Sequence, residues 1–301
     1  MLTKRKAMIF GFTAAAAFGM LAIEAFPQNA NRDWVTAWGT SQQALGEAKI
    51  SNATVRMIAR LTIPGDSIRI RLDNTFGSVP VTFGRVTIGP RIQGPAVAAG
   101  LNKPVTFGEK SSVTIPAGES VRSDPVALRV EAQQDLAVSL FVTGVDIEPS
   151  QHTGAVVTSY LTGNNAGDQT QSEDGKPFTG KTTATFWLKS IDVRPARPAT
   201  AIIAFGDSIT DGACTTLDGH DRWEDIVAQR LAMLTPARLS IVNEGIGGNT
   251  VTSADQCAFA TRGEQPVGDG PPRARCVVAF GRQPCGAVHG YERYPARSRR
   301  R

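Results

Sequence analysis

The stretch AIIAFGDSITDG, residues 201–212, places five apolar residues directly before Gly206, Asp207 and Ser208. A short, continuously apolar run is typical of a strand that is covered on both faces of a parallel sheet. The residues after such a strand lie at its carboxyl end, where α/β proteins place their active sites. Two interpretations follow: Ser208 is a nucleophile at the sheet edge, or Asp207 and Ser208 cap the next helix.

The residues downstream extend this α/β pattern. RWEDIVAQRLAML (222–234) has apolar residues at helical spacing, and RLSIVNEGIGGNT (238–250) is a second apolar strand that enters a Gly-rich loop. Strand, helix and strand form a βαβ unit, so a parallel sheet is predicted to begin near Thr200. We therefore predict an α/β segment over residues 196–252, with the GDS and GIGGN motifs at the same sheet edge.

Residues 31–195 predict a β-sandwich domain. TVRMIARLTI (54–63) and SIRIRLDNTF (67–76) alternate apolar and polar residues, which is the period of half-buried strands. Further short runs of this kind are separated by Gly, Pro, Asn and Asp, and many short strands with frequent turns favour an antiparallel sandwich. Pro195 and Pro198 mark a short linker to the α/β segment.

Residues 1–30 predict a secretory signal peptide. The basic residues 4–6 precede an apolar run over residues 7–22, and Ala25 and Ala30 offer cleavage points. The alternative is an uncleaved anchor, because the apolar run approaches the length of a membrane span. We expect export to the periplasm or the cell exterior, with no stable membrane span after cleavage.

The charge of the chain is unevenly distributed. The formal net charge is +5, and residues 253–301 alone carry it, with nine arginines against four acidic residues. The preceding residues are balanced, so the body of the protein does not favour a nucleic-acid partner. The four cysteines have no zinc-site spacing, and three of them lie in residues 253–301. We predict neither a metal nor a cofactor, and no disulfide framework.

Together, FGDSITDG (205–212) and NEGIGGNT (243–250) resemble the SGNH, or GDSL, hydrolase family of esterases and lipases. The upstream β-rich region resembles exported bacterial members that carry an N-terminal β-sandwich. The resemblance implies a flavodoxin-like α/β/α fold, here truncated, and hydrolysis of acyl or acetyl esters through a serine nucleophile. Lipid, carbohydrate or small-molecule esters are the implied substrates.

Four residues of these motifs have expected roles. Ser208 matches the family's nucleophile, and Gly248 matches a glycine whose backbone N–H helps to bind the oxyanion of the tetrahedral intermediate. Asp207 is expected to shape the loop as an acceptor, and Asn249 to be part of the loop structure. The structural alternatives are a helix cap for Ser208 and a turn glycine for Gly248.

Two further blocks of the family pattern, Gly-x-Asn-Asp and a late Asp-x-x-His, are absent. His152 lies in the β-rich region, where packing is the favoured role. His220 precedes Asp221 and lies much earlier in the chain than the family's base, so it is a weak candidate for a substitute base. His289 has Gly286, not an aspartate, at the required offset. Since serine needs a base to become nucleophilic, impaired activity is expected.

Residues 253–301 have the composition of GC-rich DNA translated in a wrong frame. Codons for GYERY (290–294) exist that give Gly-Met-Asn-Asp when read one base later, so we hypothesise a frameshift after Val251. The DNA sequence itself tests this hypothesis. We expect an α/β fragment of low stability and a disordered tail, in which only CVVAF (276–280) resembles a strand.

An alternative function is a non-catalytic, carbohydrate- or surface-binding sandwich with a decayed hydrolase domain. Trp34, Trp38 and Trp187 are the candidates for a sugar-binding platform, although tryptophan in a sandwich is more often part of the core. Nucleic-acid or membrane binding by the arginine-rich tail ranks last, because an out-of-frame origin explains those arginines.

Overall fold

The computed structural model describes residues 34–249 and a strand at residues 275–279. The predicted signal peptide, residues 1–30, lies outside the described residues, as does the predicted tail apart from that strand. Within the described part of the chain, no helix has the length and apolar character needed to cross a membrane.

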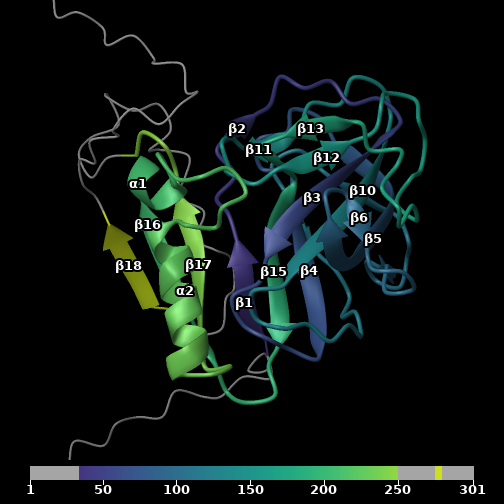
Figure 1. The fold of residues 1–301 in the computed structure, drawn as a ribbon. Coiled ribbons are helices and arrows are strands. Elements are labelled where there is room, and N and C mark those ends of the chain that lie inside the picture. Colours follow the sequence, from purple (N-terminus) through teal and green to yellow (C-terminus); the bar gives the residue numbers. More distant parts are fainter. Residues whose placement is uncertain (1–33, 250–274, 280–301) are drawn as a thin grey trace, which may run out of the picture. The chain divides into compact units, whose positions relative to one another are not determined.

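The described chain contains two helices and eighteen strands (Figure 1). The elements are β1 (Val35–Gly39), β2 (Ala44–Leu45), β3 (Ala53–Arg60), β4 (Ser67–Asp73), β5 (Val81–Gln93), β6 (Ala96–Val97), β7 (Lys103–Val105), β8 (Val113–Ile115), β9 (Ser120–Arg122), β10 (Asp135–Thr143), β11 (Ser150–His152), β12 (Ser159–Leu161), β13 (Gly180–Thr182), β14 (Thr185–Phe186), β15 (Leu188–Arg194), β16 (Thr200–Gly206), α1 (Ser208–Asp211), α2 (Trp223–Leu234), β17 (Leu239–Gly245) and β18 (Arg275–Ala279).

Antiparallel sheets build the region up to residue 195, as the alternating sequence predicts. The larger sheet has the order β13-β12-β3-β10-β5-β6, with β7 and β8 also paired to β5. The smaller sheet has the order β1-β15-β4-β9, and a short third sheet has the order β14-β11-β2. In the centre of the larger sheet, β10 pairs with β3 without a register shift from Asp135 opposite Arg60 to Val142 opposite Ala53.

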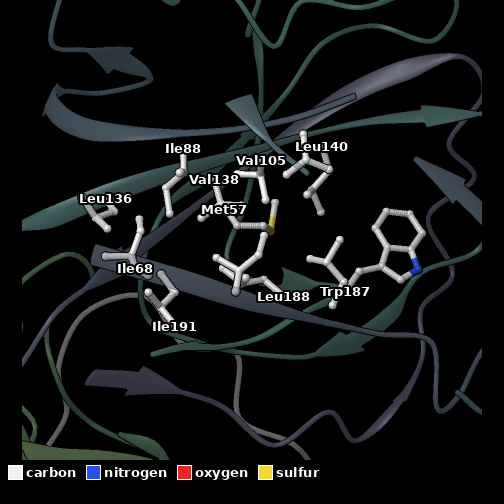
Figure 2. Packing of buried hydrophobic residues seen from close by; sticks show 14 of the residues in the cluster. Met57, Ile68, Ile88, Val105, Leu136, Val138, Leu140, Trp187, Leu188 and Ile191 are labelled. Carbon is white, nitrogen blue, oxygen red and sulfur yellow. The ribbon is translucent and has the colours of Figure 1, made fainter. Parts of the chain in front are cut away.

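The hydrophobic core lies between the two larger sheets. Met57 and Val138 of the larger sheet and Leu188 and Ile191 of the smaller one are buried in one cluster and point toward one another (Figure 2). Burial of such side chains stabilises each by roughly 1.5–3 kcal/mol relative to the exposed state. This packing confirms the predicted β-sandwich architecture of the N-terminal region.

The three tryptophans of this region do not form a sugar-binding platform. Trp187 is fully buried, with its ring edge-on to Phe83 at a centroid distance of 5.4 Å. Trp34 is also buried, and the guanidinium of Arg69 lies 4.6 Å from its ring centroid. Trp38 is half-buried and lines a small pocket. The platform interpretation is therefore wrong, and the core interpretation is confirmed for Trp187, which belongs to the hydrophobic core, with Trp38 packed against it.

The predicted parallel sheet is present, with three strands among the described residues. β16 pairs in parallel with β17 from Thr200 opposite Leu239 to Gly206 opposite Gly245. The GDS and GIGGN motifs therefore leave the sheet at the same edge, as predicted. On its other side β16 pairs in parallel with β18, which overlaps the CVVAF stretch of the predicted tail. Helix α2 packs against β17, with Ala228 and Ile241 in one small cluster (Figure 1).

The α/β segment shares the hydrophobic core of the sandwich. Ala201, Ile203 and Val242 of the parallel sheet belong to the same buried cluster as Val35 and Ala37 of β1. Low stability was expected for a βαβ unit that lacks the covering helices. In this chain β1, the edge strand of the smaller sandwich sheet, covers one face of the parallel sheet instead of a helix.

The two layers approach each other closely at Gly39 of β1. A Cβ atom on this glycine would lie 2.8 Å from the Val242 Cγ1 atom and 2.9 Å from a carboxylate oxygen of Glu244. Real Cβ atoms essentially never come that close to another heavy atom. The absence of a side chain at Gly39 therefore permits the contact between β1 and β17.

We expect Gly39→Ala to lower the free energy of unfolding by about 1–3 kcal/mol, which is the usual cost of overpacking a core. Urea unfolding followed by tryptophan fluorescence measures this change. Gly163→Ala is the matched control, because a Cβ atom at Gly163 meets nothing within 4 Å. Equal destabilisation by the two variants would contradict the close packing of β1 on β17.

Candidate functional site

Ser208 is the first residue of α1, directly after β16. The helix is capped by Asp207, whose side chain accepts a hydrogen bond from the Ile209 N–H at 3.0 Å. The capping oxygen thus comes from Asp207, so the capping role considered for Ser208 is filled by its neighbour. Asp207 shapes the loop, as predicted. The helix ends at Asp211, and Gly212 caps it with a φ of 116°, in the left-handed region that glycine adopts without strain.

The Gly-rich loop after β17 folds back onto the end of β16. The Ile246 N–H donates to the Gly206 carbonyl at 3.1 Å, and the Asn249 side-chain amide donates to the same carbonyl at 3.3 Å. Asn249 therefore has the predicted structural role in the loop. Gly248 is exposed and has a φ of 87°, a conformation that suits glycine. These bonds hold the loop that contains Gly248 beside Gly206 and Asp207, which directly precede Ser208.

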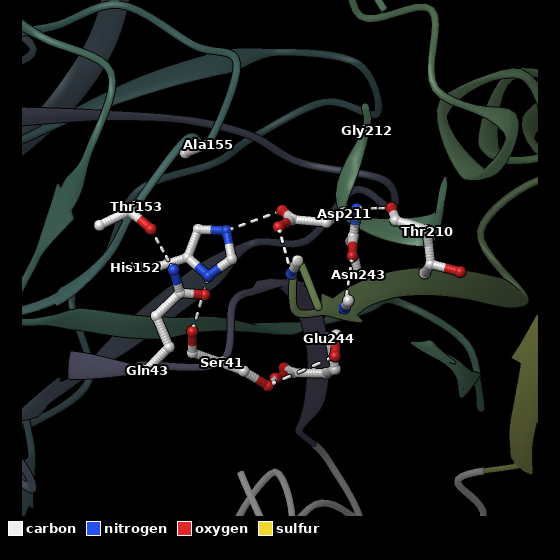
Figure 3. A network of polar contacts seen from close by, with 12 residues as sticks. Ser41, Gln43, His152, Thr153, Ala155, Thr210, Asp211, Gly212, Asn243 and Glu244 are labelled. Carbon is white, nitrogen blue, oxygen red and sulfur yellow. Dashed lines mark hydrogen bonds and ion pairs between the residues drawn. The ribbon is translucent and has the colours of Figure 1, made fainter. Parts of the chain in front are cut away.

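Asp211 connects the two motifs. One carboxylate oxygen accepts a hydrogen bond from the Gly247 N–H at 2.9 Å, and the other lies 2.9 Å from the His152 Nε2 atom (Figure 3). Asp211 belongs to the quoted GDSITDG motif, but nothing in the sequence indicated its partners. His152 lies 59 positions upstream, on β11 of the sandwich.

Both ring nitrogens of His152 are engaged. The second nitrogen, Nδ1, lies 2.8 Å from the Ser41 carbonyl oxygen (Figure 3). A carbonyl and a carboxylate only accept, so we assign a proton to each nitrogen, which makes the ring an imidazolium. Burial favours the neutral ring, but the ion pair and hydrogen bond with Asp211 outweigh it and raise the His152 pKa. With both ring nitrogens engaged in this way, His152 has no lone pair for Ser208.

His220 faces the sandwich. Its Nε2 atom lies 3.9 Å from a carboxylate oxygen of Asp135 on β10, and both burial and the nearby Arg60 lower the His220 pKa. The ring lines a cavity of about 50 Å³, together with Trp38, Arg60 and Arg222. His289 lies outside the described residues. Of the two described histidines, His152 is bound to Ser41 and Asp211 and His220 lies beside Asp135, so neither is hydrogen bonded to the Ser208 hydroxyl.

Two buried carboxyl groups lie close to the loop. Glu244, at the end of β17, accepts a hydrogen bond from the Ser41 hydroxyl at 2.5 Å, and burial raises its pKa to about 7 (Figure 3). Glu224, in the first turn of α2, accepts a hydrogen bond from the Asn243 amide, and burial raises its pKa to about 8. No group of three or more potential metal ligands converges among the described residues.

Cys214 follows α1 and is disulfide-bonded. The sequence predicted no disulfide framework, and this bond departs from that prediction. The signal was weak because the other three cysteines all lie in residues 253–301.

Comparison with known protein families matches residues 202–271 to the model described as GDSL-like Lipase/Acylhydrolase. The match includes both motifs that led to the predicted resemblance, and this resemblance is confirmed for the matched segment. The family model implies a carboxylic ester hydrolase. The match extends to residue 271, whereas the α/β segment was predicted to end at residue 252; that boundary stays a prediction.

Among solved structures, the chain matches the structure of a family two carbohydrate esterase from Cellvibrio japonicus. The two share 11% sequence identity, and the match covers 72% of this chain and 51% of that one, with a TM-score of 0.19. The chain thus spans about half the length of that esterase, and a similarity at this score carries no argument. A search of curated proteins found no match.

The raised pKa of Glu244 predicts a loss of stability as the pH rises. The pKa is about 7 in the folded chain and 4.5 for the free side chain. The folded state therefore binds the proton more tightly, and this stabilisation is fully present below the unfolded pKa and lost as the pH passes through 7. Each pKa unit corresponds to about 1.4 kcal/mol, so the expected loss is roughly 3 kcal/mol between about pH 4 and about pH 8.

Urea unfolding of Glu244→Gln at both pH values measures this loss. The glutamine does not ionise in this range, so the fall in stability with pH should be smaller in the variant than in the wild type by the Glu244 contribution of roughly 3 kcal/mol. The exposed Glu119→Gln is the control and should keep the wild-type pH dependence. A Glu244→Gln variant with the same pH dependence as the wild type would show that the carboxyl group is not buried as described.

Proposed function

We propose that this chain is an exported serine ester hydrolase of the GDSL type, and that its activity is impaired because the described residues offer Ser208 no base. The observation that carries the proposal is the parallel register of β16 and β17. It brings the GDS motif and the GIGGN loop to one sheet edge, inside a segment that matches the family model. Acyl or acetyl esters of lipids, carbohydrates or small molecules are the proposed substrates.

In the proposed reaction, the Ser208 hydroxyl oxygen attacks the carbonyl carbon of the ester. The carbonyl oxygen becomes an oxyanion, and the backbone N–H groups of Ser208 and Gly248 stabilise it. The carbon–oxygen bond to the alcohol then breaks, which leaves an acyl-enzyme that water hydrolyses by the same steps. Gly248 suits the donor role because it is exposed and has no side chain to block the substrate.

The impairment follows from the proton that Ser208 must lose. A base takes this proton in the first step and returns it to the leaving alcohol. His152 carries two protons and is held by Ser41 and Asp211, and His220 lies beside Asp135. We infer that neither histidine removes the Ser208 proton, and that acylation and hydrolysis of the acyl-enzyme are both slow.

We also propose export, on two observations. The basic and then apolar pattern of residues 1–30 is that of a secretory signal. Cys214 is disulfide-bonded, and disulfides persist mainly in oxidising compartments.

Chemical rescue tests the proposed reaction. Wild-type and Ser208→Ala chains are compared in the hydrolysis of p-nitrophenyl acetate at increasing concentrations of free imidazole. Imidazole supplies the missing base, so the wild-type rate should rise at least about tenfold above that of the variant. The variant is the control for hydrolysis by imidazole in solution. Equal rates at every imidazole concentration would contradict the assignment of Ser208 as the nucleophile.

A further inference from the structure

The two oxygens of Asp211 bind groups from different parts of the chain, and the proposed reaction uses neither bond directly. We propose that His152 and Asp211 are positioning residues that fix the distance between Ser208 and Gly248. The sandwich would thereby set the geometry of the hydrolase site. This inference rests on the proposed function, because the distance matters only if Ser208 attacks and Gly248 binds the oxyanion.

Asp211 is rigidly connected to both groups. It lies at the other end of the single-turn helix α1 from Ser208, and its N–H donates to the Asp207 carbonyl at 2.9 Å. Gly247, whose N–H donates to Asp211, is the residue directly before Gly248. A displacement of the Asp211 carboxylate therefore changes the separation of the nucleophile and the oxyanion donor. Oxyanion donors act at about 2.7–3.1 Å, so shifts well below 1 Å affect the rate.

His152 is anchored within the sandwich on two sides. Its backbone lies on β11, where it pairs with Thr185 of β14. Its ring is held by the Ser41 carbonyl, and the Ser41 hydroxyl also donates to Glu244 at the end of β17. The imidazolium is thus oriented by the packed sandwich before it binds Asp211, which is what a support for a functional residue requires.

Contacts within the α/β segment hold α1 and β17 together but do not involve the sandwich. The Asn243 amide donates to the Thr210 carbonyl at 2.7 Å (Figure 3). A Cβ atom on Gly245 would lie 2.3 Å from the Asp211 backbone nitrogen, so β17 and α1 are in direct backbone contact. Among the described hydrogen bonds of Asp211, only the one to His152 comes from the sandwich.

The charged groups around His152 favour the imidazolium on balance. Asp211 forms the ion pair, and the buried Glu244 is close enough for His152 to lower its pKa. Arg222 opposes the charge on His152, and its guanidinium is held by the Ala155 carbonyl. The pair of opposite charges is buried, so removal of one partner leaves the other uncompensated.

Amide hydrogen exchange of the full chain, followed by NMR, tests the proposal with His152→Gln and Asp211→Asn. Each variant should speed exchange of the Gly247 N–H at least about tenfold, because its acceptor is displaced or weakened. The amides of Ile241 and Val242 in β17 should stay within about twofold. His220→Gln is the matched control, since it removes a buried imidazole that contacts neither motif, and it should leave Gly247 unchanged.

Two exchange results would overturn the proposal. One is an unchanged Gly247 N–H in His152→Gln, and the other is equal acceleration of Gly247, Ile241 and Val242, which is the pattern of a purely structural role. Titration of the wild type keeps the test independent of the variants' folding. The Gly247 amide resonance should shift with the same midpoint as the His152 ring, and a Gly247 resonance that does not follow this midpoint also contradicts the proposal.

Imidazole-supported hydrolysis tests whether the contact between His152 and Asp211 affects the reaction. His152→Gln should lower kcat at least about tenfold and leave KM within about twofold, because oxyanion geometry affects the transition state and not substrate binding. If Gly247 exchange responds but Ser208→Ala leaves hydrolysis unchanged, His152 and Asp211 do position Gly247, and the proposed function is wrong. If hydrolysis depends on Ser208 but His152→Gln changes neither kcat nor Gly247 exchange, the positioning role fails and the function stands.

Discussion

The contact between β1 and β17 at Gly39 is the constraint on which the remaining structure depends. Because Gly39 has no side chain, the edge of the sandwich reaches the parallel sheet closely enough to share one hydrophobic core with it. Parallel sheets need cover on both faces, and in this chain the sandwich provides the cover for one of them. The hydrolase-like segment is therefore part of the same packed unit as the β-rich region. The low stability expected for it assumed an isolated fragment, and in this chain the segment packs on the sandwich.

Three titratable groups at the boundary of this shared core have raised pKa values. Ser41, on the loop after β1, binds both the His152 ring and the Glu244 carboxyl group. Glu244 and Glu224 have raised pKa values because burial penalises the carboxylate, whereas His152 has a raised pKa because Asp211 compensates for burial. All three groups bind protons more tightly in the folded chain, so this boundary is more stable at acidic than at alkaline pH.

Local patterns in the sequence predicted much of the fold. The alternation in residues 54–63 and 67–76 gave the strands of the sandwich, and the apolar run before Gly206 gave the parallel strand. The placement of Ser208 and Gly248 at one sheet edge follows from the βαβ rule and is confirmed. These features depend on neighbours in sequence or on a general rule of topology, and so they are visible without a structure.

The links between distant segments were not predictable. His152 on β11 binds Asp211 on α1, 59 positions further along the chain, and no local pattern in the sequence indicates this contact. The disulfide at Cys214 is likewise not indicated by any local pattern. The strand at residues 275–279 overlaps the CVVAF stretch that resembles a strand, but no local pattern indicates its parallel pairing with β16.

The central claim is that the sandwich and the α/β segment unfold as one cooperative unit. Native-state hydrogen exchange over a range of urea concentrations tests it most directly, by comparing Val138 and Leu140 in the sandwich core with Ile203 and Val242 in the parallel sheet. The shared core predicts that all four amides converge on the same free energy of opening, equal to that of global unfolding. A separate, lower opening free energy for Ile203 and Val242 would contradict it, because the α/β segment would then unfold while the sandwich stays folded.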